Sequence, residues 1–195
     1  ITWTATFTPT ASISDATNVI TLDTTGVSDT PGNAGVGTTD SNNYAIDTVR
    51  PTATIVVADT SLIIGETSLV TITFSEAVTG FSNADLTIAS GTLSAISSAD
   101  GGITWTATLT PTASITDATN VITLGNTGVS DAVGNAGIGT TDSNNYAVDT
   151  QRPTVLISVS DTSLIAGETS LVTIAFSEAV TGFDNADLTI ANGTL

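Results

Sequence analysis

The chain lacks the residue types that carry most metal and acid–base chemistry in enzymes. It contains no cysteine and no histidine, and its only basic side chains are Arg50 and Arg152. Disulfides and thiolate zinc sites are therefore excluded, and so are imidazole ligands and the commonest general base. Only a pair of carboxylates remains for catalysis, and no pair of acidic residues stands out by its spacing. We expect a protein that is not an enzyme.

The charge is almost entirely of one sign. The chain has 19 acidic side chains and a formal net charge of −17. A surface of this kind excludes binding to nucleic acid or to an anionic membrane through basic patches. Cations are its natural partners, because self-repulsion opposes compaction unless salt or bound metal neutralises it. The sequence also lacks a run of about 18 apolar residues, so it predicts neither a membrane span nor a signal peptide among these residues.

What the sequence does contain is a repeat. Residues 1–93 align without a gap on residues 103–195, and 76 of the 93 pairs are identical, so the period is 102 residues. The segment 43–52, for example, returns as 145–154. This period is too long for a solenoid and fits a small globular domain repeated in tandem.

The phase of the repeat divides the chain into three parts, which meet near Arg50 and Arg152. Residues 50–151 form a complete unit. Residues 1–49 match the C-terminal part of a unit, and residues 152–195 match the N-terminal part. We expect the chain to be a piece of a longer array.

Within a unit the apolar residues follow a period of two. The clearest strand covers residues 68–76, where Val70, Ile72 and Phe74 are expected to point inward and the intervening Thr and Ser outward. Other short strands are predicted over 51–62, 85–88, 93–96, 103–109, 119–124 and a last segment that ends at 148. Turn residues bound them and no helical period occurs. The fold class predicted is all-β, with tandem immunoglobulin-like β-sandwiches of about 102 residues each, and a β-barrel as the alternative.

Several motifs along the whole chain are those of a known family. They are Arg-Pro-Thr (50–52), Gly-Glu-Thr (65–67), Thr-Phe-Ser-Glu-Ala-Val (73–78), Ser-Asp-Ala-Val-Gly-Asn (130–135), Asn-Tyr-Ala-Val-Asp-Thr (145–150) and Asn-Gly-Thr-Leu (192–195). In these motifs the chain resembles the bacterial Ig-like domain repeats of giant surface adhesins and biofilm proteins. The resemblance implies an extracellular stalk at the bacterial cell surface, whose partners are neighbouring repeats, often with calcium at the joints. Each linker here carries one acid, Asp47 or Asp149, where calcium-rich relatives carry a run of them.

The acidic residues of the joint are candidate calcium ligands. Alternating strands bring Glu76 and the turn at Asp131 to the pole of the unit that the incoming linker reaches. Calcium binds carboxylate, carbonyl and water oxygens, which are the ligands this chain offers. We therefore expect Asp47, Glu76 and Asp131 to converge on a calcium ion between units. Asp85 and Asp100 are candidate further ligands.

The second joint repeats these features. Asp149 and Glu178 are expected to form the same half-site there. The alternative is that all these acids are solvated turn and cap residues, as Asp beside Gly or Asn commonly is. Arg50 and Arg152 are each expected to pair with a nearby carboxylate and to orient the linker more than to stabilise it.

Two other functions are open at this point. A unit of this kind could recognise a glycan or a protein through its loops or a strand face, which an exposed aromatic cluster would favour. Trp105, however, alternates with Ala107 and Leu109 and is predicted to anchor the core. The Thr-rich strands fit the wet face of a sheet better than an ice-binding surface, because Thr is β-branched and the strands are interrupted by turns.

The incomplete parts also leave two explanations open. Together, residues 152–195 and 1–49 lack only the phase of residues 94–102. The chain is either a window on a continuous protein, or a subunit whose identical copies join head to tail by completing each other's split unit, as in donor-strand addition. In both cases neither part is expected to fold alone, because half a sandwich exposes its core and its strand edges.

Overall fold

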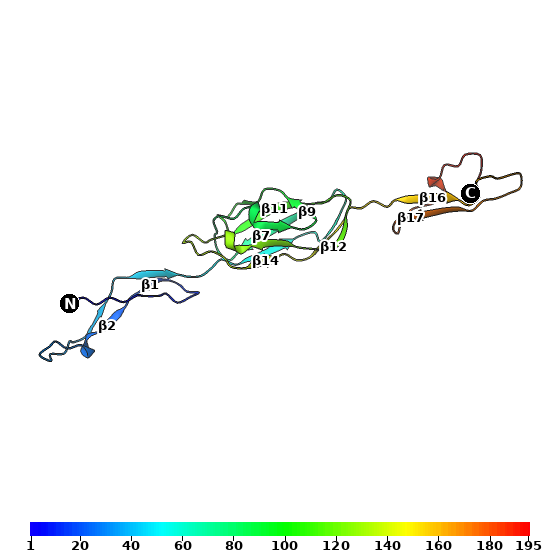
Figure 1. Ribbon diagram of the computed structural model, residues 1–195. Helices are drawn as coiled ribbons and strands as arrows, with labels where there is room; N and C mark the ends of the chain where they lie inside the picture. Colours follow the sequence, from blue (N-terminus) through cyan, green and yellow to red (C-terminus); the bar gives the residue numbers. More distant parts are fainter.

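The computed structural model describes residues 1–195 and shows a central β-sandwich between two thinner parts, so that the ends of the chain lie on opposite sides of it (Figure 1). All its regular structure consists of strands and four short 3-10 turns, which confirms the predicted all-β class. No helical segment is long and apolar enough to span a membrane. The strands of the central unit are β5 (Ala53–Val57), β6 (Ser61–Ile63), β7 (Ser68–Phe74), β8 (Leu86–Ile88), β9 (Gly91–Leu93), β10 (Ser97–Ser98), β11 (Thr104–Pro111), β12 (Thr116–Asn120), β13 (Ile122–Gly125), β14 (Thr140–Asp142) and β15 (Tyr146–Asp149).

The two layers of the sandwich have the order expected for an immunoglobulin-like fold. In the first layer β7 pairs antiparallel with β5 and β11, and β9 and β10 pair with the far edge of β11. In the second layer β13 lies between β8 and β14, and β15 lies between β12 and β6. The strands β12 and β13 follow each other almost directly, so these two ladders continue one another. The inner faces of both layers pack against each other, as such sandwiches require.

The core confirms the alternation predicted for β7. Val70, Ile72 and Phe74 are buried, whereas Leu69 and Thr73 on the opposite face are exposed. The core cluster has 15 buried apolar residues, drawn from both layers. At about 1.5 to 3 kcal/mol for each large side chain removed from water, this cluster supplies the main driving force for folding of the unit.

Trp105 packs against the core, as predicted. Its ring meets that of Phe81 edge to face, with the ring centroids 5.3 Å apart, and its indole N–H donates to the carbonyl oxygen of Gly102 at 3.1 Å. Both contacts suit a large ring with one polar group.

The prediction of one strand over residues 51–62 is wrong. The segment breaks at Asp59, whose carboxylate accepts a hydrogen bond from the main chain of Ser61, and β6 then crosses to the other layer. There it pairs in parallel with β15. The strand predicted over 93–96 is also displaced, because β9 ends at Leu93 and β10 begins at Ser97.

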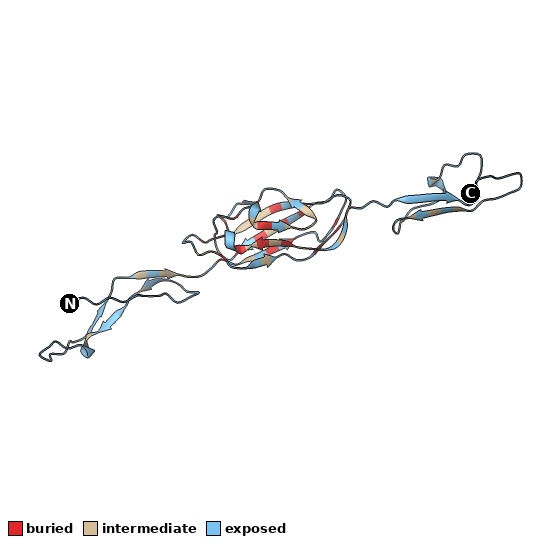
Figure 2. Ribbon diagram, viewed as in Figure 1, coloured by how far each residue is buried: buried red, intermediate tan, exposed pale blue.

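The flanking parts are hairpins without a core. All 24 buried residues of the chain lie between Pro51 and Thr150, and Figure 2 shows buried positions only in the central unit. Leu124 is fully buried, but the equivalent Leu22 is 55% exposed. The strands of the flanking parts are β1 (Ser14–Asn18), β2 (Thr21–Asp23), β3 (Thr38–Asp40) and β4 (Tyr44–Asp47) before the central unit, and β16 (Val155–Val159) and β17 (Val172–Phe176) after it. Positions that form the core of the central unit are thus exposed in the flanking parts.

Candidate functional site

The most organised feature at the joint is a loop of the central unit, residues 130–137, which we call the joint loop. It is built around the carboxylate of Asp131, whose Oδ1 accepts hydrogen bonds from the main-chain N–H groups of Val133, Gly134 and Asn135 at 2.7 to 3.0 Å. Its Oδ2 accepts from the side-chain amide of Asn135 at 2.7 Å. Burial raises the pKa of Asp131, but the hydrogen bonds from Asn135, Gly134 and Val133 outweigh it and hold the pKa below its usual value. Asp131 is therefore an ionised structural group that shapes the loop.

Backbone geometry explains the two glycines of the joint loop. Gly134 has φ +98°, a conformation that glycine adopts without strain. Gly137 has no room for a side chain, because a Cβ there would lie 2.6 Å from the carbonyl oxygen of Asn126. The loop is further tied to the neighbouring loop by paired main-chain hydrogen bonds between Ser130 and Thr79.

The same loop forms in the first part of the chain, where the unit is incomplete. Asp29 accepts from the main chain of Gly32 and Asn33, and from the side chain of Asn33 at 2.8 Å. The hydrogen bonds from the side chain and then the main chain of Asn33 lower the pKa of Asp29. Because no core surrounds these residues, the local sequence itself specifies the shape of the loop.

The linker between the first two parts is short and anchored at both ends. At its start, the hydroxyl of Thr48 donates to the carbonyl oxygen of Thr10 at 2.8 Å, and its main-chain N–H donates to Ile13. At its end, Thr52 exchanges hydrogen bonds with Ser75 of the central unit. Only Val49, Arg50 and Pro51 lie between these anchors, a span of about 10 Å even when extended. Pro51 is buried, and its ring restricts the backbone further.

Two hydrogen bonds connect the joint loop to the linker. The side-chain amide of Asn135 donates to the carbonyl oxygen of Asp47 at 3.1 Å, and the guanidinium of Arg50 donates to the carbonyl oxygen of Ala136. The prediction that Arg50 pairs with a carboxylate is therefore wrong at this joint. Its partner is a main-chain carbonyl, and the net charge of the chain gives no indication of such a partner.

The carboxylates predicted to meet at the joint lie near one another without gathering around a point. Burial, followed by the charges of Asp131 and Asp47, raises the pKa of Glu76. Glu76 is thus within electrostatic range of both other carboxylates. The structure contains no group of three or more acidic side chains placed to hold a metal ion, and most hydrogen-bonding capacity of Asp131 is used inside the loop. Calcium binding by these residues stays a prediction.

The other candidate ligands have local partners. Asp85 caps a short helical turn, η2 (Asn83–Asp85), through the main chain of Ser82. Asp100 accepts from the main chain of Thr104, which is the first cause of its pKa falling to about 2. Asp149 accepts from the hydroxyl of Thr116 at 2.8 Å. Glu178 lies in an exposed segment after β17.

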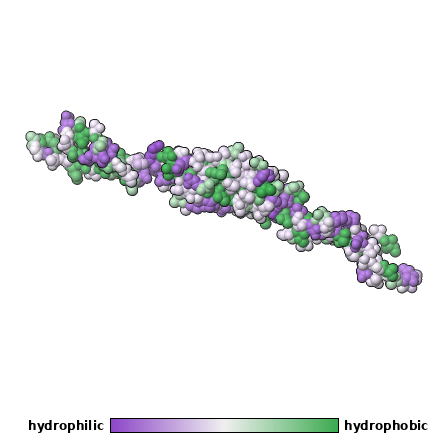
Figure 3. Space-filling view, turned by 180° about the vertical axis from the view of Figure 1, so that it is seen from behind, coloured by the Kyte–Doolittle hydropathy of each residue, from purple (hydrophilic) through white to green (hydrophobic).

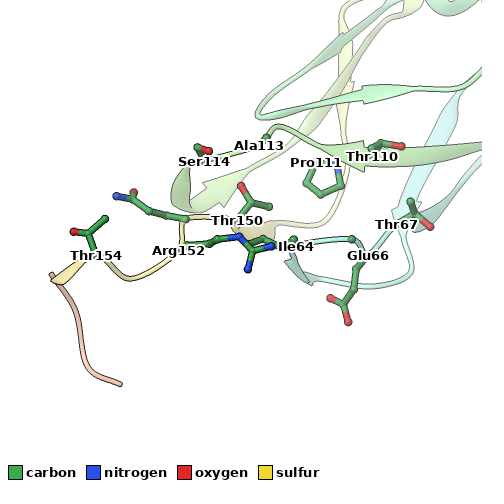
Figure 4. A pocket seen from close by; sticks show the side chains of 12 residues that line it. Ile64, Glu66, Thr67, Thr110, Pro111, Ala113, Ser114, Thr150, Arg152 and Thr154 are labelled. Carbon is green, nitrogen blue, oxygen red and sulfur yellow. The ribbon is translucent and has the colours of Figure 1, made fainter. Parts of the chain in front are cut away.

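The opposite pole of the central unit is hollowed beside the second linker. Figure 4 shows side chains from three segments around this pocket of about 630 Å³: the turn before β7, the end of β11 with its following turn, and the outgoing linker with Arg152. Thr150 is buried there and repeats the anchoring of Thr48, since its hydroxyl donates to the carbonyl oxygen of Thr112 at 2.6 Å. Arg152 and the carbonyl of Asp149 lie in the same positions of the linker as Arg50 and Asp47 in the first one.

Sequence reasoning missed Asn135 as a residue of the joint. Gly beside Asn indicates only a turn, because turns of this composition are common and their side-chain donors point in no predictable direction. The signal that could have found it is that two patterns both recur in the chain: the linker pattern, and Ser-Asp-x-x-Gly-Asn-Ala-Gly at 28–35 and 130–137.

Comparison with known families gives one result that covers the chain. The family described as bacterial Ig-like domain matches residues 1–46, 47–148 and 149–195 in succession. Its boundaries fall three residues before those drawn from the repeat at 50 and 152. No catalytic family matches. Comparisons with curated proteins and with solved structures gave no match.

Proposed function

The chain belongs to the family of bacterial Ig-like domains, which are typical of surface proteins, and on that premise we propose that it is a structural repeat of an extracellular stalk. Its role is to separate other parts of a bacterial surface protein, and its partners are the neighbouring repeats. The observation that carries the proposal is the short linker anchored at both ends, with two hydrogen bonds to it from the joint loop. A linker of this kind resists bending more than a flexible chain of equal length.

The absence of an evident ligand site also supports a spacer. The aromatic residue that would favour glycan recognition, Trp105, is partly buried against the core. The pocket at the far pole lies beside the outgoing linker and Arg152, where a following unit has to begin. A binding module would instead need an exposed face away from the joints.

Small-angle scattering of tandems with one, two, three and four copies of residues 50–151 tests the proposal. A stalk requires that each added copy lengthen the maximum dimension by the same increment. A maximum dimension that stops growing with copy number would show that the units fold back on one another. This result would contradict the spacer function. Binding of the single unit to a glycan array would favour the recognition module.

A calcium ion at the joint is a second proposal, favoured by the charges around Glu76. Its pKa is raised by burial and by the charges of Asp131 and Asp47, so a cation would relieve repulsion that the folded joint otherwise contains. The ion would use the oxygen atoms of Asp47, Glu76 and Asp131. Sites in extracellular modules bind calcium with dissociation constants of about 10⁻⁴ to 10⁻³ M.

The melting temperature with calcium and with chelator tests this second proposal. Calcium should raise the melting temperature of the wild type and leave the melting temperature of the Glu76→Gln variant unchanged. Glu178→Gln is the matched control and should respond to calcium as the wild type does. Glu178 is equivalent to Glu76, but residues 152–195 do not include an equivalent of Asp131. A wild type that melts at the same temperature in both conditions would remove calcium from the joint.

A further inference from the structure

The joint loop reaches the preceding linker with two groups of fixed direction. We propose that this loop sets the orientation of each unit relative to the one before it, through the amide of Asn135 and the carbonyl of Ala136, and that it does so without a metal ion. The proposal rests on the proposed stalk function, because orientation matters only between units that follow one another. It assigns a positioning role to Asn135 and Arg50.

The joint loop is formed before it docks. The carboxylate of Asp131 holds the amide of Asn135 at 2.7 Å while the same amide donates to Asp47 across the joint. In the incomplete first part, Asp29 holds Asn33 in the same manner, although no unit precedes it in the structure. Little conformational entropy is therefore lost when the loop docks, which makes a contact of few hydrogen bonds effective.

Two units that both carry many carboxylates repel one another, and neutralising them by salt bridges would need more cations than the one arginine that each linker carries. The contact instead uses one neutral amide and the only cation nearby, and both donate to main-chain carbonyl oxygens. No carboxylate is a direct partner across the joint in these two hydrogen bonds. The contact is thus independent of calcium, although calcium could add to it.

The two halves of the contact repeat together along the chain. The linker pattern Asp-Thr-x-Arg-Pro-Thr occurs at 47–52 and 149–154, and the joint loop pattern occurs at 28–35 and 130–137. The carbonyl of Asp149 and the side chain of Arg152 are accordingly the acceptor and donor for the joint loop of a unit that follows. The same contact at every joint gives a constant angle between successive units, as in other regular arrays.

The test uses a tandem of two copies of residues 50–151, in which the sequence of the joint is retained and both units are complete. Because the chain has no cysteine, Thr54→Cys in each copy provides one exposed labelling site per unit for distance measurement by electron spin resonance. Asn135→Ala in the second copy removes the donor at the joint. The same change in the first copy loosens an identical loop whose Asn135 has no preceding linker carbonyl to contact, and it is therefore the matched control. Arg50→Ala in the second copy removes the other hydrogen bond without altering the loop.

The expected wild-type result is one narrow distance distribution that is the same with calcium and with chelator. A hydrogen bond contributes about 0.5 to 1.5 kcal/mol, so each second-copy variant should raise the undocked fraction roughly fivefold and broaden the distribution. The first-copy control should leave it narrow. Equal distributions for the two Asn135 variants would overturn the proposal, and so would a wild-type distribution that broadens in chelator. If the wild-type distance distribution broadens in chelator while scattering shows that the tandem stays extended, this proposal fails and the stalk function does not.

Discussion

The side chain of Asn144 holds the main chain of Val57 through both of its polar atoms. Its Oδ1 accepts from the N–H of Val57 at 2.8 Å, and its Nδ2 donates to the carbonyl oxygen of Val57 at 3.1 Å. This pair joins the end of β5 to the segment before β15, where the first strand leaves one layer for the other. The contact therefore supports the crossing that the sequence pattern did not predict.

Asn144→Ala should destabilise the central unit by about 1 to 3 kcal/mol, because two hydrogen bonds are lost and two main-chain groups of a buried residue lose their partner. Urea unfolding monitored by tryptophan fluorescence measures the change. The matched control is Asn42→Ala, since Asn42 occupies the same position of the repeat but its amide donates only to Asn43. Equal effects of the two substitutions would contradict the role given to Asn144.

The repeat provides a second matched pair in the core. Leu124→Ala should lower the free energy of unfolding by about 2 to 5 kcal/mol, because it removes a fully buried side chain and leaves a cavity. Leu22→Ala should change the free energy of unfolding by less than about 0.5 kcal/mol, since Leu22 is 55% exposed. A comparable cost at Leu22 would mean that the first part is covered in solution by another segment or another copy.

Alkaline pH should destabilise the central unit through Tyr146. Burial, followed by the charge of Asp117, raises the pKa of Tyr146 to about 12, against about 10 in an unfolded chain. The contribution of this group to stability is complete below pH 10 and is lost as the pH rises to about 12, because the unfolded state releases the proton first. The chain has no lysine, histidine or cysteine, so few other groups titrate in this range.

Unfolding measured by circular dichroism between pH 9 and pH 12.5 checks this prediction. Tyr146→Phe should lose that part of the pH dependence while also losing the hydrogen bond to the carbonyl of Ala89. If the variant and the wild type lose stability with the same slope, another group is responsible.

The exposed apolar side chains of the last part should become buried when its unit is completed. Figure 3 shows apolar residues at the surface of both flanking parts, and Ile157 is 52% exposed, whereas the equivalent Ile55 is 5% exposed. Extending the chain after Leu195 by a copy of residues 94–151 should slow amide hydrogen exchange in β16 and β17 by several orders of magnitude, because local opening is replaced by cooperative unfolding.

The control for this prediction is the same extension with Ala107→Pro in the added copy, which removes a main-chain donor from a central strand. Exchange in β16 and β17 should then stay fast. Fast exchange with both extensions would show that the added copy does not complete the unit.

Much of this fold was predictable because its determinants are local. The alternation in residues 68–74 depends only on the period of a strand, and it placed Val70, Ile72 and Phe74 in the core. The place of Glu76 and Asp131 at the pole nearest the linker followed from counting strand directions. The crossing of β6 to the other layer was not predictable, because it depends on parallel pairing with β15, whose residues lie 86 positions further along the chain than their partners.

The candidate site was predicted at the level of its place but not of its contacts. The sequence indicated carboxylates at the joint, and their charges do act on Glu76. The contacts across the joint, however, are made by Asn135 and Arg50 with main-chain carbonyls. Such acceptors exist at every residue, so only the spatial arrangement selects one of them.

By itself, the sequence determined the repeat of 102 residues, the all-β class and the shape of the joint loop, which forms around both Asp29 and Asp131. These features depend on backbone preferences and on hydrogen bonds within a few residues. Only the tertiary structure decided which side chains are buried: Trp105 packs against the core, whereas the identical Trp3 is 90% exposed. Burial is a property of what surrounds a side chain, so the same residues have different fates where the partner strands are present and where they are not.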